Sequence, residues 1–195
     1  TPCTSSNVAK TVTHPHLPGA IHHQALRFLC LYKFCARSTI SRIIYEYLPF
    51  CTPIDKQLER NQMKTIGLLG GMSWESTATY YRIINQETNK RLGGLHSAPI
   101  VMISVDFHVI DAFQKRGDWS AAACYLIDKA QQAQTAGAQC LLICTNTMHK
   151  VADAVRAAIN IPLLHIADAT ATALLDKNIR EVGLLGTRFT MEEKF

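Results

Sequence analysis

From Met63 onward, short apolar runs alternate with stretches whose apolar residues recur every three or four positions. The first run, 65–71, ends in glycines and precedes a helical pattern from Trp74 to Gly93-Gly94. Further strand-like runs follow at 98–105, 140–143, 163–166 and 181–187. Helices are predicted from Asp118 to Gly137, over 150–159, and from a cap at Asp168. This alternation predicts an α/β fold with a parallel sheet covered by helices on both faces, a βα sandwich.

Residues 1–62 lack this pattern and mix Pro, His, Cys and Ser without sustained periodicity. They show no secretory signal, and the first methionine of the chain is Met63. We therefore expect a leader that is not part of the fold, the rival interpretation being a short helical appendage over 38–48. Gly67-Leu-Leu-Gly70 recurs as Gly183-Leu-Leu-Gly186, which indicates internal duplication. The predicted division is a leader at 1–62, a first lobe at 63–180, and the first strand and turn of a truncated second lobe at 181–195.

Composition narrows the class of protein. The chain of 195 residues is 48% hydrophobic and 18% charged, and no apolar run approaches the roughly 20 residues of a membrane helix. Most of the +5 net charge lies in the leader, so a nucleic-acid surface is not expected. Seven cysteines without a C-x-x-C pair are typical of reduced thiols, which favours a cytoplasmic protein with no metal site.

The candidate chemistry is concentrated where the third apolar run ends. Cys144 to His149 follow this run at a predicted strand-to-helix turn, and ligands of parallel sheets bind beyond the carboxyl ends of strands. The plainer interpretation is that Thr145 or Thr147 only caps the following helix.

Two further turns are expected at the same edge. Gly70-Gly71-Met72-Ser73 allows a carboxylate to approach the backbone closely, or serves only as a tight turn. It matches neither the dinucleotide fingerprint nor the Walker loop. Residues 106–117 are predicted to be a long polar loop. In it, Gln114, Lys115 and Arg116 contact a second polar group of the ligand, or Lys115 and Arg116 are simply solvated.

Four motifs together resemble the aspartate/glutamate racemase family, in particular its bacterial amino-acid racemase branch. They lie at 67–77 (Gly-Leu-Leu-Gly-Gly-Met-Ser-Trp-Glu-Ser-Thr), 145–149 (Thr-Asn-Thr-Met-His), 165–170 (His-Ile-Ala-Asp-Ala-Thr) and 183–187 (Gly-Leu-Leu-Gly-Thr). The resemblance covers Met63 to Phe195. It implies one lobe of a two-lobed, pseudo-symmetric α/β enzyme that inverts amino acids without pyridoxal phosphate or another cofactor. The resemblance leaves open whether the full-length protein forms a homodimer.

The family places an acid-base residue, usually cysteine, in each lobe. Here Thr145 occupies the first-lobe cysteine position, and Cys144, one residue earlier, is expected on the opposite face of the strand. By motif position, the resemblance assigns Thr145 to acid-base catalysis and gives substrate-binding roles to Met72, Gln114, Asn146, Thr147 and Thr187. Cys144 is interpreted as a small buried apolar residue, and any catalytic part for it stays open.

The resulting hypothesis is a racemase for aspartate, glutamate or a broader set of amino acids. The chain alone is expected to be inactive, because the second catalytic cysteine would lie in the missing lobe. A sibling activity, such as hydantoin racemase or maleate isomerase, is an alternative. From a different class, a non-catalytic α/β module that binds small carboxylates also stays open.

Overall fold

The computed structural model describes residues 10–12, 63–184 and 188–192. Three parallel strands form its central sheet in the order β3-β2-β4, with bounds β2 (Ile66–Gly70), β3 (Ile100–Ser104) and β4 (Cys140–Ile143). Ile66 lies opposite both Ile100 and Cys140, so the carboxyl ends of all three strands meet at one edge. The predicted α/β class with a parallel sheet is confirmed.

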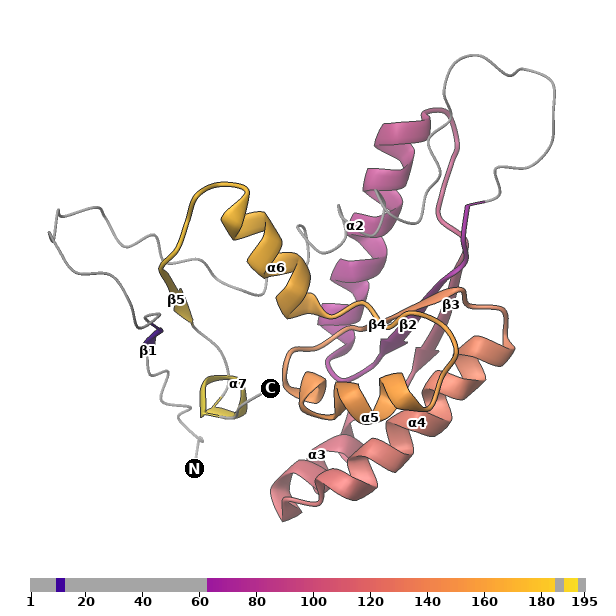
Figure 1. Cartoon of the computed structure of the whole chain (residues 1–195). Coiled ribbons are helices and arrows are strands. Elements are labelled where there is room, and N and C mark those ends of the chain that lie inside the picture. Colours follow the sequence, from indigo (N-terminus) through magenta and orange to yellow (C-terminus); the bar gives the residue numbers. More distant parts are fainter. Residues whose placement is uncertain (1–9, 13–62, 185–187, 193–195) are drawn as a thin grey trace, which may run out of the picture.

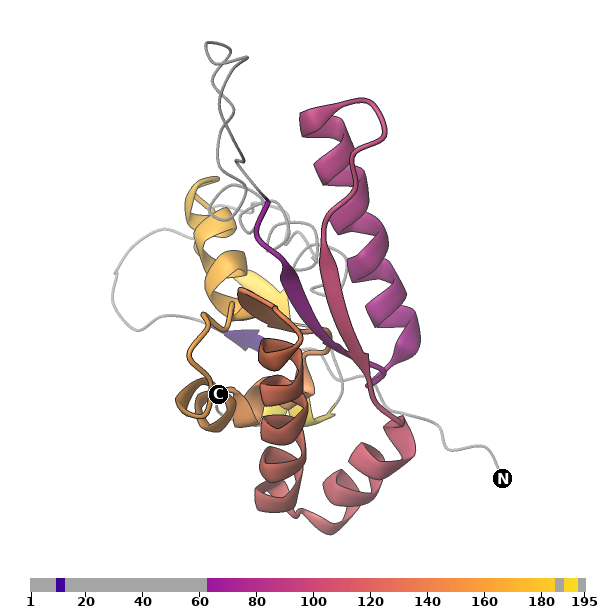
Figure 2. The same cartoon turned by 90° about the vertical axis from the view of Figure 1, so that its right-hand side faces the viewer.

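Helices cover both faces of this sheet, with α2 on one side and α4 and α5 on the other (Figures 1 and 2). The helical segments are α2 (Trp74–Leu92), α3 (Phe107–Arg116), α4 (Trp119–Thr135), the 3-10 turn η1 (Thr147–Val151), α5 (Ala152–Ala157), α6 (Ile166–Leu175) and α7 (Arg188–Glu192).

Successive residues of β4 supply the two cores in turn, because side chains of a strand alternate between faces. Cys140, Leu142 and Cys144 belong to the cluster that contains Tyr80 and Ile84 of α2. In the opposite cluster, Leu141 and Ile143 pack with α4 and α5 residues, among them Leu126, Ala130 and Val155. The whole of β4 is buried as a result, which explains why its sequence is continuously apolar.

Two predicted elements are wrong. Residues 106–117 are not a loop but contain α3, which is capped by Asp106 and ends at Gly117 with φ 68°. Ile110 is its only buried residue, although Phe107, Ile110 and Phe113 recur at three-residue steps. The predicted strand at 163–166 is reduced to a single parallel bridge between Leu163 and Leu141.

The cap predicted at Asp168 is also wrong. The chain turns at His165, whose side chain accepts a hydrogen bond from the Ala167 N–H and caps α6 in place of Asp168. Asp168 lies in the first turn of the same helix. By contrast, Asp118 caps α4 as predicted, by accepting a hydrogen bond from the Ala121 N–H.

The predicted strand at 181–187 is present as β5 (Val182–Leu184), but it does not join the parallel sheet. It pairs antiparallel with β1 (Lys10–Val12), a short segment of the predicted leader. The rest of the leader lies outside the described residues. The division at 62 and 180 stays a prediction. Across the described ranges, no helix has the length and apolarity needed to cross a membrane.

Candidate functional site

The turns after β2 and β4 are tied together at the carboxyl edge of the sheet. The Cys144 N–H donates to the Leu69 carbonyl oxygen at 2.9 Å. The Ser76 hydroxyl, in the first turn of α2, donates to the Cys144 carbonyl oxygen at 2.6 Å and is buried. The start of α2 therefore has a fixed position relative to the turn at 144–149.

The turn after β2 is built by close backbone contact. Gly71 has φ +89°, and a Cβ there would lie 2.0 Å from the Val105 carbonyl oxygen. Its N–H donates to the Thr77 hydroxyl oxygen at 2.9 Å, and that hydroxyl donates to the Ser73 carbonyl oxygen at 3.0 Å. Glycine is required here both by conformation and by space. The bend places Met72, a predicted substrate-binding residue, in the apolar cluster that also contains Met148.

The turn after β4 carries polar side chains that differ in exposure. Thr145 and Asn146 are half-buried, whereas Thr147 is buried. The Thr147 hydroxyl lies 3.3 Å from the hydroxyl of Thr190 in α7. Gln114 of α3 donates from Nε2 to the Met148 sulfur at 3.2 Å. The structure thus brings Gln114 and the 145–149 segment together, as a shared site requires.

His149 anchors this turn and has no role in the motif-based prediction. Its Nδ1 lies 2.8 Å from the Thr145 carbonyl oxygen and 3.2 Å from that of Asn146. Its Nε2 accepts a hydrogen bond from the Ile166 N–H at 3.4 Å. Burial is the main cause that lowers the pKa of His149 from 6.5 to about 4, so the ring is neutral at physiological pH. The only sequence signal was its place at the end of the Thr145–His149 motif.

The cysteines near the site are poor candidates for a thiolate. Cys144 is fully buried in the cluster on the α2 side, and burial raises the pKa of its thiol far above the ordinary value. Burial also raises the pKa of Cys140 to about 11. Both thiols are therefore protonated at neutral pH, and neither supplies a base.

The start of the predicted second lobe lies beside the same turn. The Phe189 ring of α7 packs edge-on against Trp119, with ring centroids 5.7 Å apart. The Lys150 ammonium also lies over the Trp119 ring, 4.3 Å from its centroid. Together with the contact between Thr147 and Thr190, this packing brings α7 to the site. Thr187, a predicted substrate contact, lies outside the described residues.

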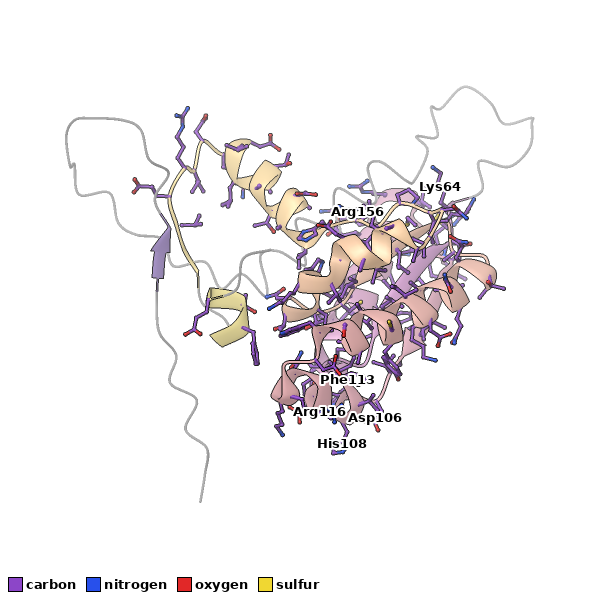
Figure 3. The ribbon with its side chains drawn as sticks, turned by 60° about the horizontal axis from the view of Figure 1, so that its bottom comes forward. Lys64, Asp106, His108, Phe113, Arg116 and Arg156 are labelled. Carbon is purple, nitrogen blue, oxygen red and sulfur yellow. The ribbon has the colours of Figure 1, made fainter. Side chains whose placement is uncertain are left out.

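The cations of α3 are engaged within their own helix. The Lys115 ammonium lies 2.6 Å from an Asp111 carboxylate oxygen. The guanidinium of Arg116, the last residue of α3, lies over the Phe113 ring at 5.4 Å from its centroid (Figure 3). Of the two interpretations given for Lys115 and Arg116, these contacts favour the one in which the side chains are solvated at the surface. Within the described residues, no cluster of three His, Cys, Asp or Glu side chains could hold a metal ion.

Fold and site define an α/β protein whose polar turns gather at the carboxyl edge of a parallel sheet, the usual place for a small-molecule site in this class. Residues 69–195 match the family described as Asp/Glu/hydantoin racemase. The chain belongs to this family.

Two solved structures resemble the chain. One is a candidate Asp/Glu racemase from Yersinia pestis, 56% identical with a TM-score of 0.59, and the match covers 60% of this chain and 50% of that one. The other is an aspartate racemase homologue from Pyrococcus horikoshii OT3, 30% identical with a TM-score of 0.55, covering 59% and 50%. The chain therefore spans about half the length of either protein.

Proposed function

We propose that this chain forms one lobe of an amino-acid racemase that works without pyridoxal phosphate, acting on aspartate, glutamate or a broader set of amino acids. The carrying observation is that the turn 145–147 follows β4 at the carboxyl edge of the sheet, in a chain of the Asp/Glu/hydantoin racemase family. Thr145 is proposed as the acid-base residue of this lobe. Asn146 and Thr147 are proposed to bind the substrate carboxylate.

Racemisation requires one group that removes the Cα proton and another that supplies a proton from the opposite side. A threonine hydroxyl is a weak base but an adequate proton donor, whereas a cysteine thiol ionises near neutral pH. With Thr145 in the position usual for cysteine, we expect unequal rates for the two enantiomers. Met72 and Gln114 would line the side of the site near Met148, where both already lie.

The second acid-base residue would come from the other lobe of a complete enzyme. The contacts of α7 with Thr147 and Trp119 support this, since they bring the start of that lobe to the polar turn. Groups that act as a unit lose nearly all activity when one is removed. The 195-residue chain alone is therefore proposed to be inactive.

The test measures solvent deuterium entering Cα of aspartate, glutamate and neutral amino acids. The chain alone should show no exchange. A version completed at its carboxyl end with the second half of the Yersinia pestis protein should exchange, and Thr145→Cys in this version should raise the rate for the slower enantiomer. Exchange by the chain alone would disprove the two-lobe mechanism. An unchanged enantiomer preference in Thr145→Cys would remove Thr145 from the acid-base position.

One observation favours a second candidate, a non-catalytic module that binds small carboxylates. The described site has a hydroxyl where the family usually has a thiol, and Cys144, one residue earlier, is buried in the cluster on the α2 side. Binding of aspartate or glutamate by the completed version, without any exchange at Cα, would support this candidate over the racemase.

A further inference from the structure

We propose that His149 is a positioning residue that holds the 145–146 turn in its active geometry and connects this turn to the start of α6. The inference rests on the proposed function, since it assigns His149 a part in presenting Thr145. It is carried by three contacts of one ring, to the carbonyl oxygens of Thr145 and Asn146 and to the N–H of Ile166.

These contacts determine where the ring proton lies. A backbone N–H can only donate, so the Ile166 N–H requires an unprotonated Nε2. Carbonyl oxygens can only accept, so Nδ1 must carry the hydrogen that faces Thr145 and Asn146. The three backbone groups therefore select one neutral tautomer, with hydrogen on Nδ1.

Each ring nitrogen serves a different segment of the chain. Nδ1 orients two consecutive peptide units of the polar turn, and the side chain of Thr145 follows the orientation of its own peptide. Nε2 contacts the first residue of α6, 17 residues further along the chain. The His165 ring, which caps α6, packs edge-on against His149 at 4.4 Å between centroids. A shift of the α6 start would therefore be transmitted to Thr145 through one imidazole.

Two amide substitutions separate the two functions of the ring. The amide nitrogen of asparagine can occupy the place of Nδ1, so His149→Asn should retain the donor to the turn and lose the contact with Ile166. The longer glutamine can bring its amide oxygen to the place of Nε2, so His149→Gln should do the reverse. His149→Leu removes both. The matched control is His108→Asn, because His108 is exposed on α3 (Figure 3).

The first measurement is NMR of the 195-residue chain with labelled histidine. We expect the Nδ1–H tautomer for His149 at pH 6 to 8, about tenfold faster exchange of the Ile166 amide in His149→Asn and His149→Leu, and near wild-type exchange in His149→Gln. The Thr145 and Asn146 amide shifts should stay near wild type in His149→Asn and move in the other two. An Nε2–H tautomer, or equal behaviour of the three variants, would overturn the proposal.

The second measurement uses the completed racemase. His149→Asn should retain most of kcat and His149→Leu should lose at least about tenfold, with similar KM in both. Equal loss of kcat in the two variants would overturn the positioning role. Because the NMR experiment does not depend on turnover, a failure of the proposed function would show as absent exchange at Cα and would leave the NMR outcome to decide the role of His149.

Discussion

The two turns at the carboxyl edge of the sheet hold their shape by opposite means. After β2, the backbone is fixed because Gly71 has no side chain and packs directly against Val105, where a Cβ would not fit. After β4, the backbone is fixed by an added side chain, since the His149 ring reaches two carbonyl oxygens and an N–H on α6. Both turns therefore contact a distant segment, the first through bare backbone packed against Val105 and the second through a side chain that reaches the start of α6.

The largest effect is expected at the first turn. Gly71→Ala places a Cβ against the Val105 backbone at a φ of +89°, and should lower the free energy of unfolding by about 4 kcal/mol or more. Chemical denaturation measures this. The control is Gly94→Ala, because Gly94 also has a positive φ but nothing within 4 Å of its Cβ position. It should cost about 1 to 2 kcal/mol, and an equal cost for both would show that close packing does not fix the first turn.

A pH titration should weaken the second turn selectively. The pKa of His149 is lowered from 6.5 to about 4, first by burial and then by His165 and Arg156, against the Thr145 and Asn146 carbonyl groups. Below pH 6.5 the unfolded chain takes up the proton and the folded chain does not. Stability is therefore complete above pH 6.5 and falls as the pH drops to about 4, by about 3 kcal/mol.

His165 adds to this dependence with the same sign, because burial lowers its pKa against the opposing charge of Asp168. The measurement is urea denaturation from pH 7.5 to 4, compared with His149→Gln. The variant removes the titrating ring, so the difference between the two plots of unfolding free energy against pH gives the contribution of His149. Parallel curves would contradict a neutral, buried imidazole at this position.

The tie between the two turns should have an intermediate effect. Ser76→Ala removes the buried hydrogen bond to the Cys144 carbonyl oxygen, and should cost about 1 to 2 kcal/mol in thermal or chemical unfolding. Thr79→Ala on the same helix is the control, since the Thr79 hydroxyl donates to the Glu75 carbonyl oxygen at an exposed position. A loss no larger than that of the control would show that the two turns are held independently.

The smallest effect is expected on deletion of residues 1–62. Within the described residues, this deletion removes only β1, which pairs with β5 over three residues and adds no strand to the parallel sheet. Two-stranded pairs of this kind are marginally stable. A chain that begins at Met63 should unfold within about 1 kcal/mol of the original, and a large fall in its melting temperature would show that the leader belongs to the fold.

The elements that sequence predicted well are those whose residues carry a local signal. Strands β2, β3 and β4 are continuous apolar runs, and α2 and α4 show both apolar periodicity and a capping Ser73 or Asp118. The 106–117 helix was missed although it carries local signals, since Ile110 and Phe113 have helical spacing and Asp106 and Gly117 are ordinary cap residues. His165 was missed as a cap because it was included in the predicted strand at 163–166, whereas α6 begins at Ile166.

At the site, motif position predicted which residues gather but not how they are held. Gln114 and Met148 meet through tertiary packing of α3 against η1, and no spacing within either segment predicts that contact. The role of His149 likewise requires Ile166 to lie beside it. By contrast, strand alternation alone accounts for Cys144, which lies in the same cluster as Cys140 and Leu142, because that rule is local.

The central place of β2 has a consequence for how the chain folds during synthesis. β2 is the first strand of the sheet to be made, and its neighbours come later, with Ile66 paired to Ile100 and then to Cys140. Parallel pairing is non-local and therefore slow. Until β4 leaves the ribosome, one edge of the apolar strand Ile66–Gly70 stays open to other chains. We therefore expect nascent chains that end before Cys140 to bind chaperones, and release to follow the emergence of the 140–149 segment.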